Sequence, residues 1–121
     1  MLRMATDDRK SLGDRCEALA AEHLLRQGYR VRQRNFRCKL GEVDLICGDG
    51  PTLVFVEVKA RRSTRFGDGA EAVDRRKQAR LMAIAQLYMA HEPDRPCRFD
   101  VVAVTLRGGA AAVEHLVGAF P

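Results

Sequence analysis

Two apolar segments joined by a tight turn constrain the fold of this chain more than any other feature. Residues 42–47 and 52–60 of the stretch GEVDLICGDGPTLVFVEVKARR are rich in Val, Leu, Ile and Phe, and the turn residues GDGP lie between them. This pattern predicts a β-hairpin. The same hairpin carries four charged residues, Glu42, Asp44, Glu57 and Lys59. Charges in such an apolar setting require a chemical reason.

The rest of the chain alternates between helical and strand-like segments. Helical periodicity over residues 8–27 ends at Gly28, a residue suited to a helix C-terminus. The pattern predicts a strand over 29–36, a second helix over 71–91 that is stopped by PDRP, and strands over 98–106 and 111–117. This order predicts an α/β fold in which a mixed five-stranded sheet is flanked by helices.

Length and composition fit one soluble domain. The chain has 121 residues, 46% hydrophobic and 31% charged, so we expect a single domain over 1–121. No apolar run approaches the roughly 20 residues that cross a bilayer, which argues against a membrane partner. The N-terminal MLRMATDDRK lacks the apolar core of a signal peptide, and we therefore expect a cytoplasmic location.

Side-chain alternation brings the charges of the hairpin together on one face of the sheet. By alternation, one face of the first strand carries Glu42, Asp44 and Ile46 and the other carries Val43, Leu45 and Cys47, while Leu53, Phe55, Glu57 and Lys59 share a face of the second strand. Two registers are open, one with Asp44 opposite Phe55 and one with Asp44 opposite Glu57. In both registers Asp44, Glu57 and Lys59 are direct or diagonal neighbours.

Carboxylates crowded on one face need a cation between them. Like charges about 4 Å apart repel by roughly 4 kcal/mol at an effective dielectric of 20, and Lys59 can balance only one carboxylate. A divalent metal such as Mg²⁺, which proteins hold through one or two carboxylates together with water and phosphate, would balance the others. Asp44 and Glu57 are the candidate ligands, with Glu42 as an accessory group. A salt-bridged sheet edge is the alternative.

Two further charged residues point inward by helical periodicity. Glu17 projects among the small and apolar residues of the first helix. It is either a buried-edge glutamate capped by an arginine or a fourth carboxylate of the metal site. Lys77 projects into the apolar stripe of the second helix, with Arg80 at its margin. Lys77 either extends along that stripe to solvent or meets the carboxylates or a bound phosphate.

The net charge of +5 is concentrated in three clusters. They consist of Arg30, Arg32, Arg34, Arg37 and Lys39, then Arg61, Arg62 and Arg65, and then Arg75, Arg76, Lys77 and Arg80. Such clusters suit a polyanion, because each neutralised phosphate releases condensed counterions. Solvated surface is the alternative for any one cluster. Their position around an acidic hairpin favours nucleic acid as the partner.

These residues resemble a known pattern. Asp44 followed by Glu57-x-Lys59 resembles the signature of the PD-(D/E)xK nuclease superfamily, and Glu17 matches the first-helix glutamate of its Holliday-junction-resolvase-like branch. The segments GYRVRQRNFR, GEVDLI, FVEVKARRS, AVDRRKQARL and RFDVVAV resemble the YraN-like bacterial family of predicted endonucleases over about residues 10–106. One position departs from the signature, because Val43 stands where the proline is expected.

The resemblance implies a restriction-endonuclease-like fold and a role for each matching residue. On this resemblance we expect Asp44 and Glu57 to bind Mg²⁺ or Mn²⁺ with help from the carbonyl of Val58, and Glu17 to be an accessory ligand. We expect Lys59 to orient or help to deprotonate the attacking water and to stabilise the phosphorane-like charge. From the basic clusters we expect DNA contacts at Arg34, Arg37, Arg61, Arg62, Lys77 and Arg80.

The sequence thus predicts a metal-dependent endonuclease that hydrolyses DNA, with branched or other non-duplex structures as candidate substrates. The alternative is a nucleic-acid-binding module on a nuclease fold that does not cut. By analogy with related resolvases we also expect a homodimer.

Overall fold

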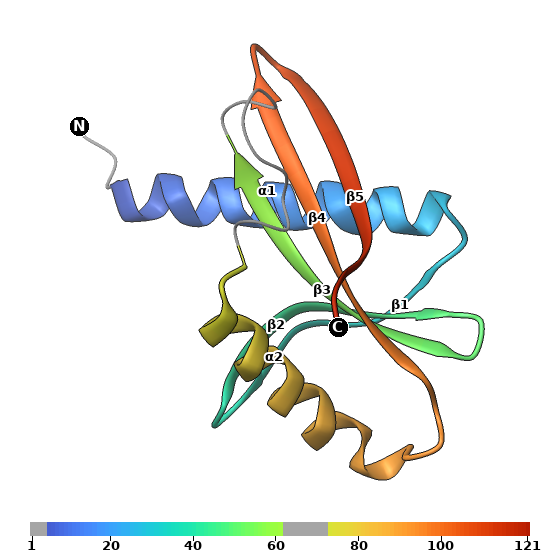
Figure 1. Ribbon diagram of the computed structural model, residues 1–121. Coiled ribbons are helices and arrows are strands. Elements are labelled where there is room, and N and C mark those ends of the chain that lie inside the picture. Colours follow the sequence, from blue (N-terminus) through green and yellow to red (C-terminus); the bar gives the residue numbers. More distant parts are fainter. Residues whose placement is uncertain (1–4, 62–72) are drawn as a thin grey trace.

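A computed structural model describes residues 5–61 and 73–121, with side chains from residue 11 onward (Figure 1). The elements are α1 (Ala5–Arg26), β1 (Arg30–Cys38), β2 (Gly41–Asp49), β3 (Thr52–Arg61), α2 (Arg75–Tyr88), the short 3₁₀ helix η2 (Met89–His91), β4 (Cys97–Arg107) and β5 (Ala110–Phe120). All five predicted strands form. Their bounds differ from the predicted ones by a few residues at the ends.

The five strands make one mixed sheet in the order β1-β2-β3-β4-β5. Neighbouring strands are antiparallel except for β3 and β4, which are parallel and flank α2 in the sequence. A parallel pair requires a crossover connection, and α2 lies in that connection. The predicted α/β fold with a mixed five-stranded sheet flanked by helices is confirmed, and it is consistent with a restriction-endonuclease-like fold.

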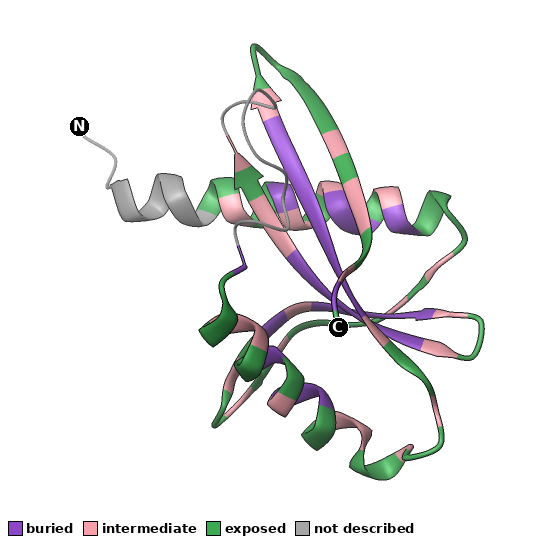
Figure 2. Cartoon of the chain, in the orientation of Figure 1, coloured by how far each residue is buried: buried purple, intermediate pink, exposed green. Residues whose placement is uncertain are grey.

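The two helices cover opposite faces of the sheet, and each face has its own apolar core (Figures 1 and 2). On the α1 side the core comprises Cys16, Ala20, Ala21, Leu24, Leu45, Cys47, Val54, Val56, Val102 and Val104. On the α2 side it comprises Val43, Ile46, Leu53, Phe55, Val73, Leu81, Ile84, Ala85, Phe99, Val101 and Phe120. Because β3 and β4 are covered on both faces, they read as nearly continuous apolar runs.

The helices end near the predicted positions for local reasons. α1 ends at Arg26, and Gly28 follows with a φ of 92°, a conformation that glycine adopts without steric cost. α2 begins after Asp74, whose side chain caps the helix by accepting a hydrogen bond from the Lys77 N–H at 2.9 Å. The second helix was predicted over 71–91, but α2 ends at Tyr88 and the chain continues as η2.

One predicted orientation is wrong. Alternation placed Val43 on the same face as Leu45 and Cys47, whereas Val43 packs in the α2-side core and the other two pack in the α1-side core. The pairing of β2 with β3 extends from Asp49 only to Leu45. Beyond that point β2 curves with β1 toward α2 (Figure 1), so strict alternation relative to the sheet is lost.

Neither α1 nor α2, within the ranges given above, combines the length and apolar character that a bilayer-spanning helix needs.

Candidate active site

The candidate site lies where β2 separates from β3. The hairpin closes with Asp49 paired to Thr52, and the last paired residues are Leu45 and Val56. Continuing this register by one step places Asp44 opposite Glu57, which is the second of the two predicted registers. Its loop is shorter than expected, because only Gly50 and Pro51 lie between the paired residues. The hairpin therefore delivers both carboxylates to one place.

Just beyond the last paired residues, the Asp44 side chain connects β2 to β3. Its Oδ2 accepts a hydrogen bond from the backbone N–H of Val58 at 2.8 Å. Burial and, after it, the negative charge of Glu57 together raise the pKa of Asp44 to about 7, although the hydrogen bond from the Val58 N–H partly opposes both effects. Glu17 and Glu42 add smaller contributions of the same sign as Glu57. The Asp44 carboxylate is therefore close to other negative charges and is only partly accessible to water.

Glu57 is buried on β3, with 8% of its side chain exposed, and its Oε2 forms an ion pair with the Nζ of Lys77 from α2. The inward projection of Lys77 thus leads to a carboxylate, the second of the two possibilities left open by the sequence. Lys59, which was expected to balance the carboxylates, lies two residues farther along β3 and is half-buried. The counter-charge of Glu57 comes instead from Lys77 of α2.

Glu17 approaches the same corner from α1 and is half-buried. Burial raises the pKa of Glu17, while side-chain hydrogen bonds with Asn35 and Asp44 partly oppose this and the charge of Glu42 adds to it. Asn35 has a φ of 52°, in the left-handed region that asparagine tolerates better than most residues. The structure thus brings Glu17 beside Asp44. Among the side chains of residues 11–61 and 73–121 there is no ion pair between Glu17 and an arginine, which the alternative interpretation required.

Glu42 lies at the margin of the site. Its side chain is 40% exposed and forms an ion pair with Arg37 of β1 at 3.5 Å. Such a solvated pair contributes little to stability. Glu42 therefore acts on Asp44 and Glu17 only through its charge.

The donor atoms suit a hard divalent cation. Asp44, Glu57 and Glu17 offer carboxylate oxygens, which Mg²⁺ and Mn²⁺ prefer, and the effect of Glu57 on the pKa of Asp44 reflects their proximity. Within residues 11–61 and 73–121, however, no three Asp, Glu, His or Cys side chains are arranged so that they could hold a metal ion together. The residues fit the cation by their chemistry, but Glu57 is engaged with Lys77.

The predicted DNA-contacting residues are divided over several elements. Arg34 is exposed on β1, and Arg37 is exposed beside Glu42. Arg80 of α2 covers the turn between β1 and β2, where a Cβ atom at Gly41 would lie 3.0 Å from the Arg80 Cδ. Arg61 forms an ion pair with Glu114 of β5. Arg62 lies outside the described residues.

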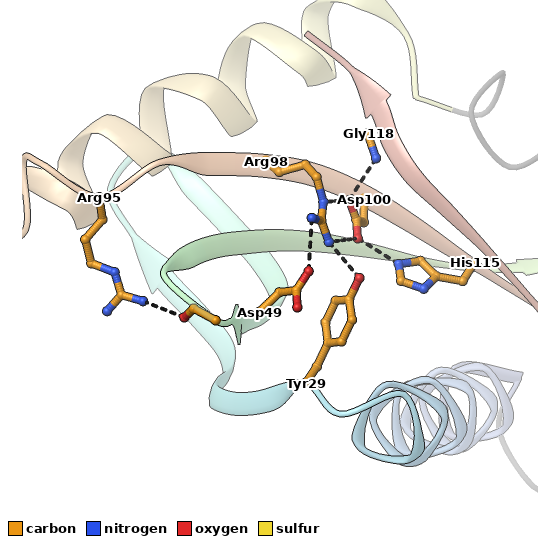
Figure 3. Close-up of polar contacts among 8 residues, drawn as sticks. Tyr29, Asp49, Arg95, Arg98, Asp100, His115 and Gly118 are labelled. Carbon is orange, nitrogen blue, oxygen red and sulfur yellow. Dashed lines mark hydrogen bonds and ion pairs between the residues drawn. The ribbon is translucent and has the colours of Figure 1, made fainter.

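A second polar cluster was not predicted (Figure 3). Asp100 of β4 is fully buried and accepts hydrogen bonds from the Arg98 guanidinium at 2.9 and 3.1 Å and from the Gly118 N–H at 2.9 Å. Its Oδ2 lies 2.7 Å from the Nε2 of His115. Arg98 also contacts the Tyr29 hydroxyl at 2.7 Å and Asp49 at 3.2 Å.

These contacts explain the charge state of Asp100. Burial alone would raise its pKa, but the hydrogen bonds from His115, Arg98 and Gly118 outweigh burial and lower the pKa below its usual value. The β4–β5 register shifts between Phe99 and Val101. The cluster therefore fastens β5 to the sheet at the point where regular pairing is interrupted. The signal in the sequence was an aspartate inside the apolar run RFDVVAV.

The chain is similar to bacterial proteins over most of its own length and most of theirs. A UPF0102 protein of Nitrosococcus oceani is 46% identical over 111 residues, covering 89% of this chain and 90% of that protein. A UPF0102 protein of Frankia alni is 47% identical over 120 residues, covering 97% and 100%. A UPF0102 protein of Moorella thermoacetica is 44% identical over 119 residues, covering 95% and 99%. Residues 16–104 match the model of the uncharacterised protein family UPF0102, within the range over which the chain resembles YraN-like proteins. The chain belongs to the UPF0102 family.

Proposed function

We propose that this protein is a divalent-metal-dependent endonuclease of the PD-(D/E)xK superfamily that hydrolyses phosphodiester bonds in DNA. The observation that carries the proposal is the convergence of Asp44 and Glu57 where β2 leaves β3. Burial, together with the charge of Glu57, raises the pKa of Asp44 there to about 7. Proteins rarely keep a buried and a half-buried carboxylate together without a chemical use for them. Lys59 follows Glu57 at the spacing of the nuclease signature.

Each residue of the site has a proposed role. Asp44 and Glu57 would hold Mg²⁺ or Mn²⁺, with Glu17 as an accessory ligand. The bound cation would supply an activated water and neutralise charge on the phosphoryl oxygens. Lys59 places an ammonium group beside the charge that develops in the transition state and orients the attacking water. Asp44 must be ionised to serve as a ligand, so its raised pKa makes the site more competent at neutral than at acidic pH.

Basic residues near the site support DNA as the substrate. Arg34 and Arg37 of β1 and Arg80 of α2 are exposed on the elements that border the carboxylates. Their charges suit phosphate groups of a strand that passes the point where β2 and β3 separate. Branched or other non-duplex DNA is the proposed substrate class, on the resemblance to resolvases. The expected homodimer and cytoplasmic location remain predictions.

One observation favours the alternative of a binding module that does not cut. Glu57 is paired with Lys77, so one of the two main metal ligands has a counter-charge of its own. A module that uses only Arg34, Arg37, Arg80 and their neighbours to hold nucleic acid would need no divalent cation.

A cleavage assay separates the two functions. Purified protein is incubated with four-way-junction, flap and duplex DNA in Mg²⁺, in Mn²⁺ and in EDTA, beside Glu57→Gln as the matched variant. We expect cleavage of at least one substrate that requires divalent metal and is lost in Glu57→Gln. Binding of DNA without cleavage under every condition would support the non-cutting module, and cleavage at full rate in EDTA would reject the metal mechanism.

A further inference from the structure

Lys77 is placed where a lysine is electrostatically unfavourable. It is the third residue of α2, and the first turn of this helix contains Arg75, Arg76 and Lys77 with no acidic residue after the N-cap Asp74. The positive end of the helix dipole disfavours cations at this position. The neighbouring arginines are exposed, but the Lys77 side chain is only 32% exposed and reaches the buried Glu57. The ion pair with Glu57 therefore compensates the unfavourable electrostatics of a lysine at this position.

The same contact occupies the carboxylate that the proposed function assigns to a divalent cation. Glu57 has 8% of its side chain exposed, and a buried carboxylate without a counter-charge is costly. Lys77 supplies that counter-charge, because its Nζ contacts the Oε2 of Glu57. A divalent cation at Glu57 would supply it as well, and two cations sharing one small carboxylate repel each other.

We propose that Lys77 is the resident counter-cation of Glu57 in the metal-free protein and that a divalent cation must displace it, so that Lys77 and the metal compete for the same carboxylate. This inference rests on the proposed metal-dependent function. Competition keeps the metal-free fold intact and weakens metal binding. Once displaced, the Lys77 ammonium remains beside the site on the N-terminal turn of α2, where the phosphate of a bound DNA strand is its natural new partner. Metal binding and DNA binding would then reinforce each other.

The test is Mn²⁺ titration calorimetry without DNA on wild-type protein, Lys77→Gln and Arg76→Gln. Both variants lose one positive charge in the same helical turn, so a general electrostatic effect changes their Mn²⁺ affinities equally. Displacement predicts that Lys77→Gln binds Mn²⁺ at least about fivefold more tightly than wild type, whereas Arg76→Gln, which leaves the Lys77–Glu57 ion pair in place, stays within about twofold.

Stability measurements keep the test decisive. Lys77→Gln leaves Glu57 without its counter-charge, so thermal melts in EDTA should show a lower melting temperature than wild type, and Mn²⁺ should restore more of it than it adds to wild type. A variant that folds only with Mn²⁺ also supports displacement. If the Gln variant folds under neither condition, Lys77→Arg decides, because the stronger arginine–carboxylate pair should weaken Mn²⁺ binding.

The outcomes separate this inference from the proposed function. Wild-type protein that binds Mn²⁺, with Lys77→Gln no tighter than Arg76→Gln, overturns the competition and leaves the metal-dependent nuclease standing. If Lys77→Arg is the variant used, an Mn²⁺ affinity equal to that of wild type also overturns the competition and leaves the metal-dependent nuclease standing. Absence of Mn²⁺ binding in wild type and in Lys77→Gln overturns both.

Discussion

Replacing Asp44 by asparagine should stabilise the metal-free protein. Asparagine has nearly the same shape, and its amide oxygen can still accept the 2.8 Å hydrogen bond from the Val58 N–H. The substitution removes a negative charge from a half-buried position beside Glu57 and Glu17. Loss of this charge removes its repulsion with the neighbouring carboxylates and so lowers the free energy of the folded state. A structural ion pair at Asp44 predicts the opposite sign.

The size of the effect follows from the pKa of Asp44, which burial and the charge of Glu57 raise from 3.8 to about 7. This interval corresponds to about 4 kcal/mol at roughly 1.36 kcal/mol per pH unit. Rearrangement of water and neighbouring side chains reduces this upper bound, so we expect a gain of about 2 kcal/mol at about pH 8. For a chain of this size the melting temperature should rise by about 8 °C.

The gain must depend on pH with a defined sign. The unfolded chain ionises Asp44 above its ordinary pKa of 3.8, whereas the folded protein keeps the group protonated up to about pH 7. Between these values the folded state binds more protons, so the stability contributed by protonated Asp44 is lost as pH rises. Asp44→Asn lacks this loss. Its advantage over wild type should therefore be nearly absent at about pH 3.5 and fully present at about pH 8.

Urea unfolding and thermal melts of both proteins in EDTA across this pH range measure the difference directly. Glu42→Gln is the matched control, because it removes a negative charge from the same strand at an exposed position, and it should change stability by less than about 0.5 kcal/mol. Destabilisation by Asp44→Asn at about pH 8, or a gain of the same size at both ends of the pH range, would refute the reasoning.

Three further predictions address the remaining parts of the molecule. Asp100→Ala removes the buried carboxylate that Arg98, His115 and the Gly118 N–H share (Figure 3). It should lower the free energy of unfolding in urea by about 3–5 kcal/mol, and a loss below about 1 kcal/mol would mean that the cluster does not fasten β5. DNA binding, followed by fluorescence anisotropy, should weaken steeply with salt, with a log–log slope of about 0.9 per neutralised phosphate on duplex. Arg80→Glu should reduce that slope more than Arg107→Glu, and equal effects would remove Arg80 from the interface. Lys59→Ala should slow cleavage by about a hundredfold while leaving Mn²⁺ affinity unchanged, and an unchanged rate would make Lys59 structural.

The features that could be predicted from the sequence are those set by local periodicity. The period of two along a strand placed Glu57 and Lys59 on one face with Phe55, and the possible lengths and positions of the turn restricted the hairpin to two registers. The helical period showed that Glu17 and Lys77 point inward. Each of these inferences needs only the geometry of one element or one hairpin.

The features that could not be predicted depend on how distant elements meet. The partner of Lys77 is Glu57 because α2 packs on one face of the sheet with Lys77 within reach of β3, and no local pattern specifies where a helix packs on a sheet. Val43 was assigned to the wrong face because alternation assumes a strand that stays in the sheet, whereas β2 curves away after Leu45. Asp100 carried the same signal as Glu57, an acid in an apolar strand, but its partners come from separate segments of the chain.

Thermal melts with and without Mn²⁺ test most directly whether Asp44 and Glu57 hold a divalent cation, as we propose. A ligand that binds only the folded state at a hundredfold excess over its Kd stabilises by about 2.7 kcal/mol. We expect millimolar Mn²⁺ to raise the melting temperature of wild-type protein relative to EDTA. Asp44→Asn should lose most of this rise while melting higher in EDTA. A wild-type melting temperature that does not respond to Mn²⁺, or an equal response in Asp44→Asn, would contradict the metal site.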